Sequence, residues 1–191
     1  MKTELNNIAT VLMGYSFRSR LDVNDSGSVA VIQMKDLTDD NQVDCSNLAR
    51  VESAPTKGHH MVSPGDLIFR SRGLTATSAI LRDDPGLAVV SAPLLRIRVN
   101  VQRVLPEYLN WYISQASAQS FLASRAIGTA QKMISKEALE SLEVHIPSLE
   151  QQHKIIELAA LAEQEQKILN KLADKRKLYL SRILLRLAQG A

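Results

Sequence analysis

The side chains best suited to catalysis or metal binding are scattered along this sequence of 191 residues. His59 and His60 adjoin in a predicted loop, where two neighbouring side chains cannot easily share one metal ion, and His145 and His153 stand apart. Cys45 has no second cysteine to pair with and is interpreted as an inert small residue. The sequence contains no phosphate-binding glycine loop, zinc-protease motif or nucleophile elbow. It therefore predicts a binding module with no catalytic residue, metal ligand or cofactor site of its own.

Hydrogen-bond donors gather instead in loops. The segment Arg70–Thr77 holds two arginines, one glycine and three hydroxyl side chains, which suit contacts to phosphates and base edges. An ordinary exposed hairpin loop has the same composition, so both interpretations stand for this segment taken alone. Gly128–Lys132 is a second polar loop. Near the N-terminus, Tyr15–Arg20 combines aromatic and basic residues, either as a contact loop or as core aromatics beside solvated arginines.

The charges are unevenly distributed, although the net charge is only +3. Residues 1–147 carry fifteen Lys/Arg and fifteen Asp/Glu, whereas residues 148–191 carry eight against five, so the surplus lies in the last segment. Within the first part, residues 22–56 hold two basic and seven acidic residues, and residues 57–103 hold seven basic and three acidic. The first part is neutral but polarised, and one face of it suits a polyanion.

The first 147 residues carry the pattern of a folded scaffold for these loops. Ser63–Asp66 has the proline and glycine of a type II turn, and Ser135 caps a short helical turn. Pro106 opens a helix whose apolar residues recur at helical spacing, and Trp111 beside this stripe is interpreted as a packing residue rather than a base-stacking one.

Short strands punctuated by turns complete the predicted α+β domain, a mixed sheet with two or three helices that ends near Pro147. Arg96 and Arg98 alternate with apolar residues, so both are expected on one outer face. Residues 38–56 are expected to form an acidic loop. The predicted strands are Val29–Met34, Leu67–Phe69, Ala79–Leu81, Leu87–Val90, Leu94–Val99 and Leu142–Ile146.

A long helix is predicted from Leu149 to Ala188. Ser148 and Gln151 form an S-x-x-Q capping box at its start, and 40 residues at 1.5 Å per residue give a helix of roughly 60 Å. Polar residues interrupt its apolar stripe at Glu165 and at Lys175 or Arg176, and the basic cluster there is interpreted as a solvated face. The helix needs a partner helix, and the residues predicted to face it are Ile155, Leu158, Leu161, Ile168, Leu172, Tyr179, Ile183 and Leu187.

Composition places the chain among folded cytoplasmic proteins. Hydrophobic residues make up 45% of the sequence, enough for a buried core, and no run reaches the roughly twenty apolar residues of a membrane span. The N-terminal residues lack the basic-then-apolar order of a signal peptide.

Six short motifs, in order, make the chain resemble the specificity subunit of type I restriction-modification enzymes. Each motif alone is weak, but together they cover nearly the whole chain and end in a proline-then-glutamine entry into the long helix. The motifs are Gly14–Phe17, Val31–Leu37, Gly65–Arg70, Leu105–Leu109, Gly128–Ser135 and Ile146–Gln152.

The resemblance implies a DNA target recognition domain over residues 1–147 and a helix over residues 148–191 for spacing, dimerisation and methyltransferase docking. A full-length subunit of this family has two such domains and two antiparallel helices, whereas this sequence has one of each and no internal repeat. We therefore expect half a subunit that homodimerises and reads an interrupted palindrome in double-stranded DNA. S-adenosylmethionine, and ATP with Mg²⁺ for any restriction subunit, are expected on partner subunits.

The resemblance also favours DNA contact by the Arg70–Thr77 and Gly128–Lys132 loops. The alternative function is a coiled-coil decoy or inhibitor that occupies methyltransferase subunits without reading DNA. The residues predicted to contact DNA are Arg18, Arg20, Lys35, Arg70, Ser71, Arg72, Thr75, Thr77, Thr129, Gln131 and Lys132.

Overall fold

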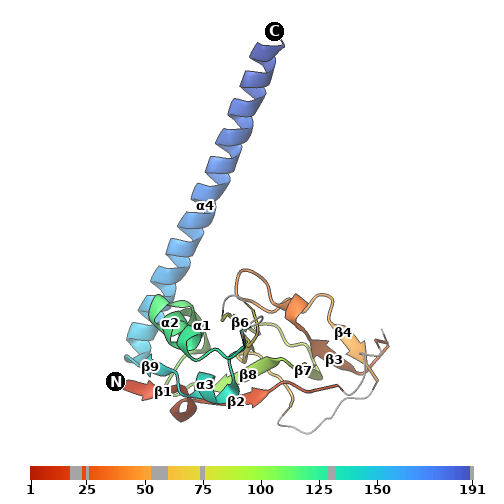
Figure 1. The fold of residues 1–191 in the computed structure, drawn as a ribbon, viewed down its shortest axis with the longest axis vertical. Helices are drawn as coiled ribbons and strands as arrows, with labels where there is room; N and C mark the ends of the chain where they lie inside the picture. Colours follow the sequence, from red (N-terminus) through yellow and green to blue (C-terminus); the bar gives the residue numbers. More distant parts are fainter. Residues whose placement is uncertain (18–22, 25, 53–59, 74–75, 129–131, 190–191) are drawn as a thin grey trace. The chain divides into compact units, whose positions relative to one another are not determined.

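The computed structural model describes residues 1–17, 23–24, 26–52, 60–73, 76–128 and 132–189. The chain divides into two compact units, Met1–Gln152 and His153–Ala191. The first contains strands and short helices, and the second contains most of the helix α4 (Leu149–Ala188) (Figure 1). The predicted α+β fold with one long C-terminal helix is confirmed, and α4 has the predicted bounds. Among the described residues, no helix combines the length and the hydropathy that a membrane span requires.

Three sheets are present in the described part of the first unit. The four-stranded sheet is antiparallel, in the order β2 (Ala9–Met13), β8 (Leu94–Val99), β5 (Leu67–Arg70) and β6 (Ser78–Ile80). The three-stranded sheet is mixed, because β3 (Val29–Ile32) pairs antiparallel with β4 (Ala49–Val51) and parallel with β7 (Ala88–Val90). A two-stranded sheet joins β1 (Lys2–Glu4) to β9 (Glu143–His145).

The main core lies between the two larger sheets. Ile32 and Val90 from one sheet pack in the same buried cluster as Ile68 and Leu94 from the other. The opposite face of β3 is buried too, because Val29 and Val31 pack with Phe17 and Met61. A strand covered on both faces needs a continuous apolar run, which Val29–Ile32 supplies.

Gly14 fixes how closely the end of β2 approaches the turn before β8. A Cβ atom at this position would lie 2.7 Å from the backbone carbon of Ser91 and 2.8 Å from the carbonyl oxygen of Leu94, so only glycine fits. The Gly14 amide donates to Leu94 and the Tyr15 amide donates to Val90, which ties the two larger sheets together.

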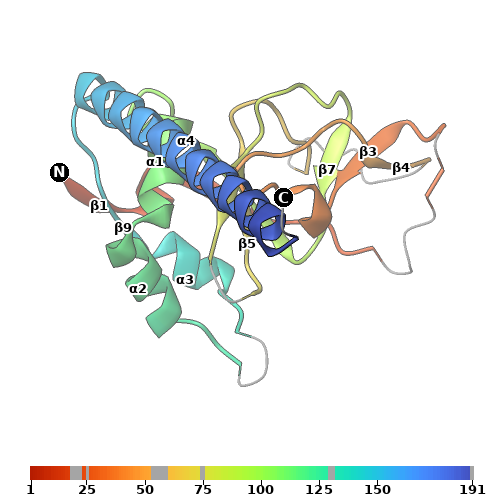
Figure 2. The same cartoon turned by 90° about the horizontal axis from the view of Figure 1, so that it is seen from above.

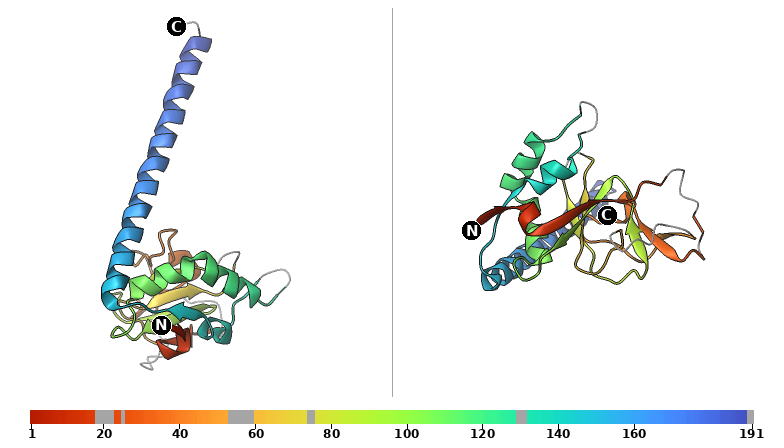
Figure 3. Two further views of the ribbon diagram at one scale, coloured as in Figure 1. Left: turned by 90° about the vertical axis from the view of Figure 1, so that its left-hand side faces the viewer. Right: turned by 90° about the horizontal axis from the view of Figure 1, so that it is seen from below.

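Three helices gather at one end of the first unit, away from β3 and β4 (Figures 2 and 3). They are α1 (Pro106–Ser114), α2 (Ala116–Ser124) and α3 (Lys136–Glu140), and two 3₁₀ turns cover Leu5–Asn7 and Met34–Asp36. Pro106 stands in the first turn of α1, and the Ser135 hydroxyl accepts from the Ala138 amide at 3.1 Å, as predicted. Trp111 is half-buried beside Tyr108, with ring centroids 5.6 Å apart.

Two expectations about the scaffold are wrong. Residues 38–56 do not form only an acidic loop, because β4 lies within them. Arg96 and Arg98 share a face of β8, but Arg96 is only 5% exposed, because the segment at Met61 covers it and accepts its hydrogen bond. The Arg98 guanidinium donates two hydrogen bonds, each of 2.7 Å, to the buried Asp66 carboxylate.

Candidate nucleic-acid interface

The structure brings the two donor-rich loops together. Backbone hydrogen bonds run from Ile134 to Ser71 at 2.8 Å and from Gly73 to Lys132 at 3.4 Å. Arg72 also forms a β-bridge with Met133, and its Nε lies 3.4 Å from the Met133 sulfur. Segments about sixty residues apart in the sequence therefore form one continuous surface.

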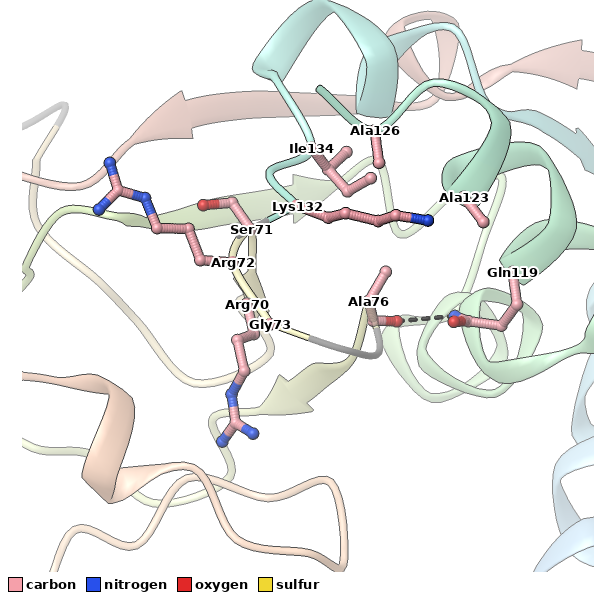
Figure 4. A pocket seen from close by; sticks show the side chains of 10 residues that line it. All are labelled: Arg70, Ser71, Arg72, Gly73, Ala76, Gln119, Ala123, Ala126, Lys132 and Ile134. Atoms are coloured by element: carbon pink, nitrogen blue, oxygen red, sulfur yellow. Dashed lines mark hydrogen bonds between the residues drawn. The ribbon is translucent and has the colours of Figure 1, made fainter. Parts of the chain in front are cut away.

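A pocket of about 80 Å³ lies where these segments meet α2 (Figure 4). Its lining includes three cations, Arg70, Arg72 and Lys132, and no carboxylate. Figure 4 shows Lys132 reaching across the pocket toward Ala123, whereas Arg70 and Arg72 point away from it. Lys132 and Arg72 are exposed, so both side chains are accessible from solvent.

Arg70 and Ser71 are turned toward the protein. The Arg70 guanidinium donates to the carbonyl oxygens of Met34 and Leu37, both at 3.4 Å. Ser71 is 4% exposed and its hydroxyl donates to the Pro93 carbonyl. These contacts hold the base of the loop, so we leave Ser71 out of the DNA-contacting set that we propose below.

Arg70 also links this loop to Lys35. Lys35 is exposed in the 3₁₀ turn whose carbonyls Arg70 binds, and its ammonium lies 2.8 Å from Asp36. Asp36 is buried and accepts from the Gln33 amide, which closes a capping box around the turn. Lys35 is thus positioned by its neighbours while its side chain stays accessible.

Thr77 is half-buried, and its carbonyl accepts from the Arg70 amide at the mouth of the β5–β6 hairpin. The other predicted contact residues lie outside the described residues and stay predictions; they are Arg18, Arg20, Thr75, Thr129 and Gln131.

Gln119 of α2 supports the loop, and the sequence pattern did not single it out. Its amide nitrogen donates to the carbonyls of Ala76 and Ile113, both at 2.7 Å. Asn110 of α1 accepts from the buried Ser78 hydroxyl at 2.7 Å and donates to the Asn41 carbonyl. The available signal was a polar residue on a helix that faces a loop, but the partners of Gln119 and Asn110 outside the helices are 32 to 69 residues away in the sequence.

The two arginines of β8, the buried Arg96 and the exposed Arg98, belong to the scaffold rather than to this surface. The hydrogen bonds that Arg98 donates to Asp66 raise the pKa of Arg98, whereas burial lowers the pKa of Arg96. Asp66 also accepts from the Ser63 amide, so one carboxylate fixes both the type II turn and β8. The positive φ of Gly65, +91°, confirms that turn.

The second candidate surface is α4 from His153 onward. Seven of the eight residues predicted to face a partner are exposed there, and Ile155 is half-buried. Leu158 is 68% exposed and Tyr179 is 66% exposed, which is unusual for large apolar side chains repeated along one helix.

Comparison with known proteins gives consistent matches. The model of the family described as "Type I restriction modification DNA specificity domain" matches residues 1–173. A chain from a structure of a type I R-M system, described for its complex assembly and conformational transition, has a TM-score of 0.73 and 15% identity. That match covers 96% of this chain and 43% of the other.

Two further structures are also similar. The HsdS subunit of Thermoanaerobacter tengcongensis has a TM-score of 0.67 and 16% identity over 90% of this chain and 39% of that one. The type I S subunit of M. genitalium has a TM-score of 0.57 and 12% identity over 90% and 41%. The chain thus spans about two fifths of each of these proteins. The TM-scores show a shared fold, and at such low identities the likeness shows the fold alone. No curated protein sequence matches it.

Proposed function

The chain belongs to the type I restriction-modification DNA specificity domain family, and from this premise we propose that it is a half subunit that reads DNA as a homodimer. The family is a DNA-recognition family without catalytic chemistry of its own. Two copies would present two recognition domains and two helices, and so direct methyltransferase subunits to a bipartite, symmetric target.

The observation that carries this proposal is the meeting of the two loops. Arg72 and Lys132, from segments that bond to each other at Gly73 and Ile134, present cations on one surface with no carboxylate in the pocket lining. Cations at loops held by a sheet suit phosphate contacts, and the polar residue types next to them in the sequence suit base edges. Of the predicted contacts, we propose Lys35, Arg70, Arg72, Thr77 and Lys132 within the described residues.

Methyl transfer, base flipping and any ATP-driven step belong to partner chains in this proposal. S-adenosylmethionine is then a cofactor of the assembly, as are ATP and Mg²⁺ where a restriction subunit joins. The exposed apolar side chains of α4 provide contact surface for these partners and for the second copy.

Coexpression with the modification subunit of the same system tests the function. We expect genomic methylation at one bipartite motif whose two halves are inverted repeats, mapped by sequencing the modified bases. A host that expresses the modification subunit alone is the control. Absence of sequence-specific methylation would instead support the decoy function, and an asymmetric motif would contradict the homodimer.

A further inference from the structure

Two charged residues, Glu165 and Arg176, lie in the middle of the apolar stripe of α4, and a third, Arg186, lies near its C-terminal end. If Ile155 opens a seven-residue repeat, Glu165 and Arg176 fall on the two positions that face a partner helix. The first such position holds Ile155, Ala162, Leu169, Arg176 and Ile183, and the second holds Leu158, Glu165, Leu172, Tyr179 and Arg186.

Neither charge has an oppositely charged neighbour on its own helix. Side chains interact along a helix at separations of three and four residues, and here these positions are all apolar. They are Leu161, Ala162, Ile168 and Leu169 around Glu165, and Leu172, Ala173, Tyr179 and Leu180 around Arg176. By contrast, Glu163 on the outer face forms an ion pair with Lys167 at 2.9 Å. Glu165 and Arg176 are both exposed, so each is available to form an ion pair with an oppositely charged side chain from outside the helix.

We propose that a second copy of this chain supplies that partner, with its α4 antiparallel and in one register. Glu165 of each copy lies opposite Arg176 of the other, and the two-fold axis passes between Leu169 and Leu172. This inference rests on the homodimer of the proposed function and specifies which residues of the two copies meet.

The same register matches three of the other four layers in size. In an antiparallel pair, one core position packs against the other across the axis. Leu158 then meets Ile183, Ala162 meets Tyr179, and Leu169 meets Leu172, each layer occurring twice. The outermost layer sets Ile155 against Arg186, at the end of the pair, where a long arginine side chain can keep its guanidinium in solvent. The small Ala162 makes room for the large Tyr179 ring, and the two leucine layers flank the axis. Their present exposure, 68% for Leu158 and 48% for Leu172, is removed by pairing.

Other registers place the charges badly. A shift of one heptad in one direction sets Glu165 against Leu169 and Arg176 against Leu158, and a shift in the other sets them against Ile183 and Leu172. An unpaired charge against an apolar side chain in an interface is costly. A parallel pair in register sets Glu165 against Glu165 and Arg176 against Arg176, which repel. Polar residues at core positions select one register and orientation in this way.

Charge exchange in the full-length chain tests the register. Glu165→Arg and Arg176→Glu each create two like-charge pairs in the dimer, so each should raise the dimer dissociation constant at least about 100-fold. The double variant E165R/R176E restores both pairs and should return within about threefold of the original value. An equimolar mixture of the two single variants should form a heterodimer. Sedimentation equilibrium over a concentration series measures all four.

Lys177→Glu is the matched control, because it reverses a charge next to Arg176 on the outer face and should leave the dissociation constant within about threefold. Single variants that dimerise as tightly as the control would overturn the register while leaving the homodimer intact. A parental chain that is monomeric at micromolar concentration would overturn both. The DNA-reading role is decided separately, by the methylation motif.

Discussion

Arg72 and Lys132 differ from Arg70 in what their charges are bonded to. Arg70 donates to two backbone carbonyls, whereas Arg72 and Lys132 are exposed beside a pocket without a carboxylate. Within the described part of the chain, the Arg72 guanidinium contacts only the Met133 sulfur, which is a weak acceptor, and a cation without a competing oxygen acceptor exchanges water for phosphate at the lowest cost. We therefore expect Arg72 and Lys132 to contribute more to DNA affinity than Arg70, which holds the loop.

The double variant Arg72→Ala with Lys132→Ala tests this ranking. Each phosphate contact contributes about 0.9 to the slope of log affinity against log salt, so the slope should fall by about 1.8 and affinity at low salt should decrease at least tenfold. Fluorescence anisotropy of labelled duplex at several salt concentrations measures both. Arg82→Ala is the control, since Arg82 is exposed at the other end of the β5–β6 hairpin beside Glu107. An unchanged slope in the double variant would place the DNA elsewhere.

At the scale of elements, Gln152 fastens the first turn of α4 to the first unit. It is fully buried, its amide nitrogen donates to the carbonyls of Arg103 and Pro147 at 3.0 Å, and its oxygen accepts from the Leu105 amide at 2.9 Å. Every polar atom of the side chain is thus satisfied. The segment before α1 and the start of α4 are joined through one residue.

Gln152→Glu should destabilise the first unit by about 2–4 kcal/mol, because a buried carboxylate faces two carbonyl oxygens that it cannot bond. Burial raises the pKa of the introduced carboxyl in the folded state above its value in the unfolded chain. The stability of the variant therefore falls as the pH rises from the unfolded-state pKa through the folded-state pKa. The loss of melting temperature, measured by circular dichroism, should be larger at pH 8 than at pH 5.

Gln151→Glu is the control for that variant. Gln151 is exposed and its side-chain oxygen accepts from the Ser148 amide at 3.3 Å, a role that a carboxylate also fills. It should leave the melting temperature nearly unchanged at both pH values. Equal losses in the two variants would refute the special position of Gln152.

The elements that the sequence predicted well are those with local causes. The helix α4 begins at its capping box, Ser148 and Gln151, and keeps one apolar period for forty residues. The turn at Gly65 and the cap at Ser135 are equally local. The strands β1 and β4 have three residues each, too few for a readable alternation, and β1 pairs with residues as far along the chain as His145.

The candidate site was predictable in composition and not in assembly. Both loops carried a donor-rich signal, but their adjacency depends on bonds such as Gly73 to Lys132, which no local pattern encodes. The inward turn of Arg70 and Ser71 has the same cause, because their acceptors, Met34, Leu37 and Pro93, come from other segments.

At the scale of the whole molecule, charge balance limits how tightly one chain holds DNA. Residues 1–147 carry fifteen cations and fifteen anions, so few phosphates are neutralised without help. We expect the protein alone to bind non-specific duplex with a dissociation constant weaker than about 1 µM at physiological salt. Binding should tighten at least tenfold when methyltransferase subunits are added in a mobility-shift titration. Nanomolar binding by the lone protein would contradict this expectation.

The pairing of β1 with β9 has a consequence for synthesis on the ribosome. Lys2 is opposite His145, so β1 needs a partner that is translated 143 residues later. At about 5–20 residues per second this interval is roughly 7–29 s. Because α4 begins at Leu149, soon after β9, the pairing of β1 with β9 can form only after translation of the long helix has begun. Until then β1 has no strand partner, and an unpaired strand can bind chaperones or other chains.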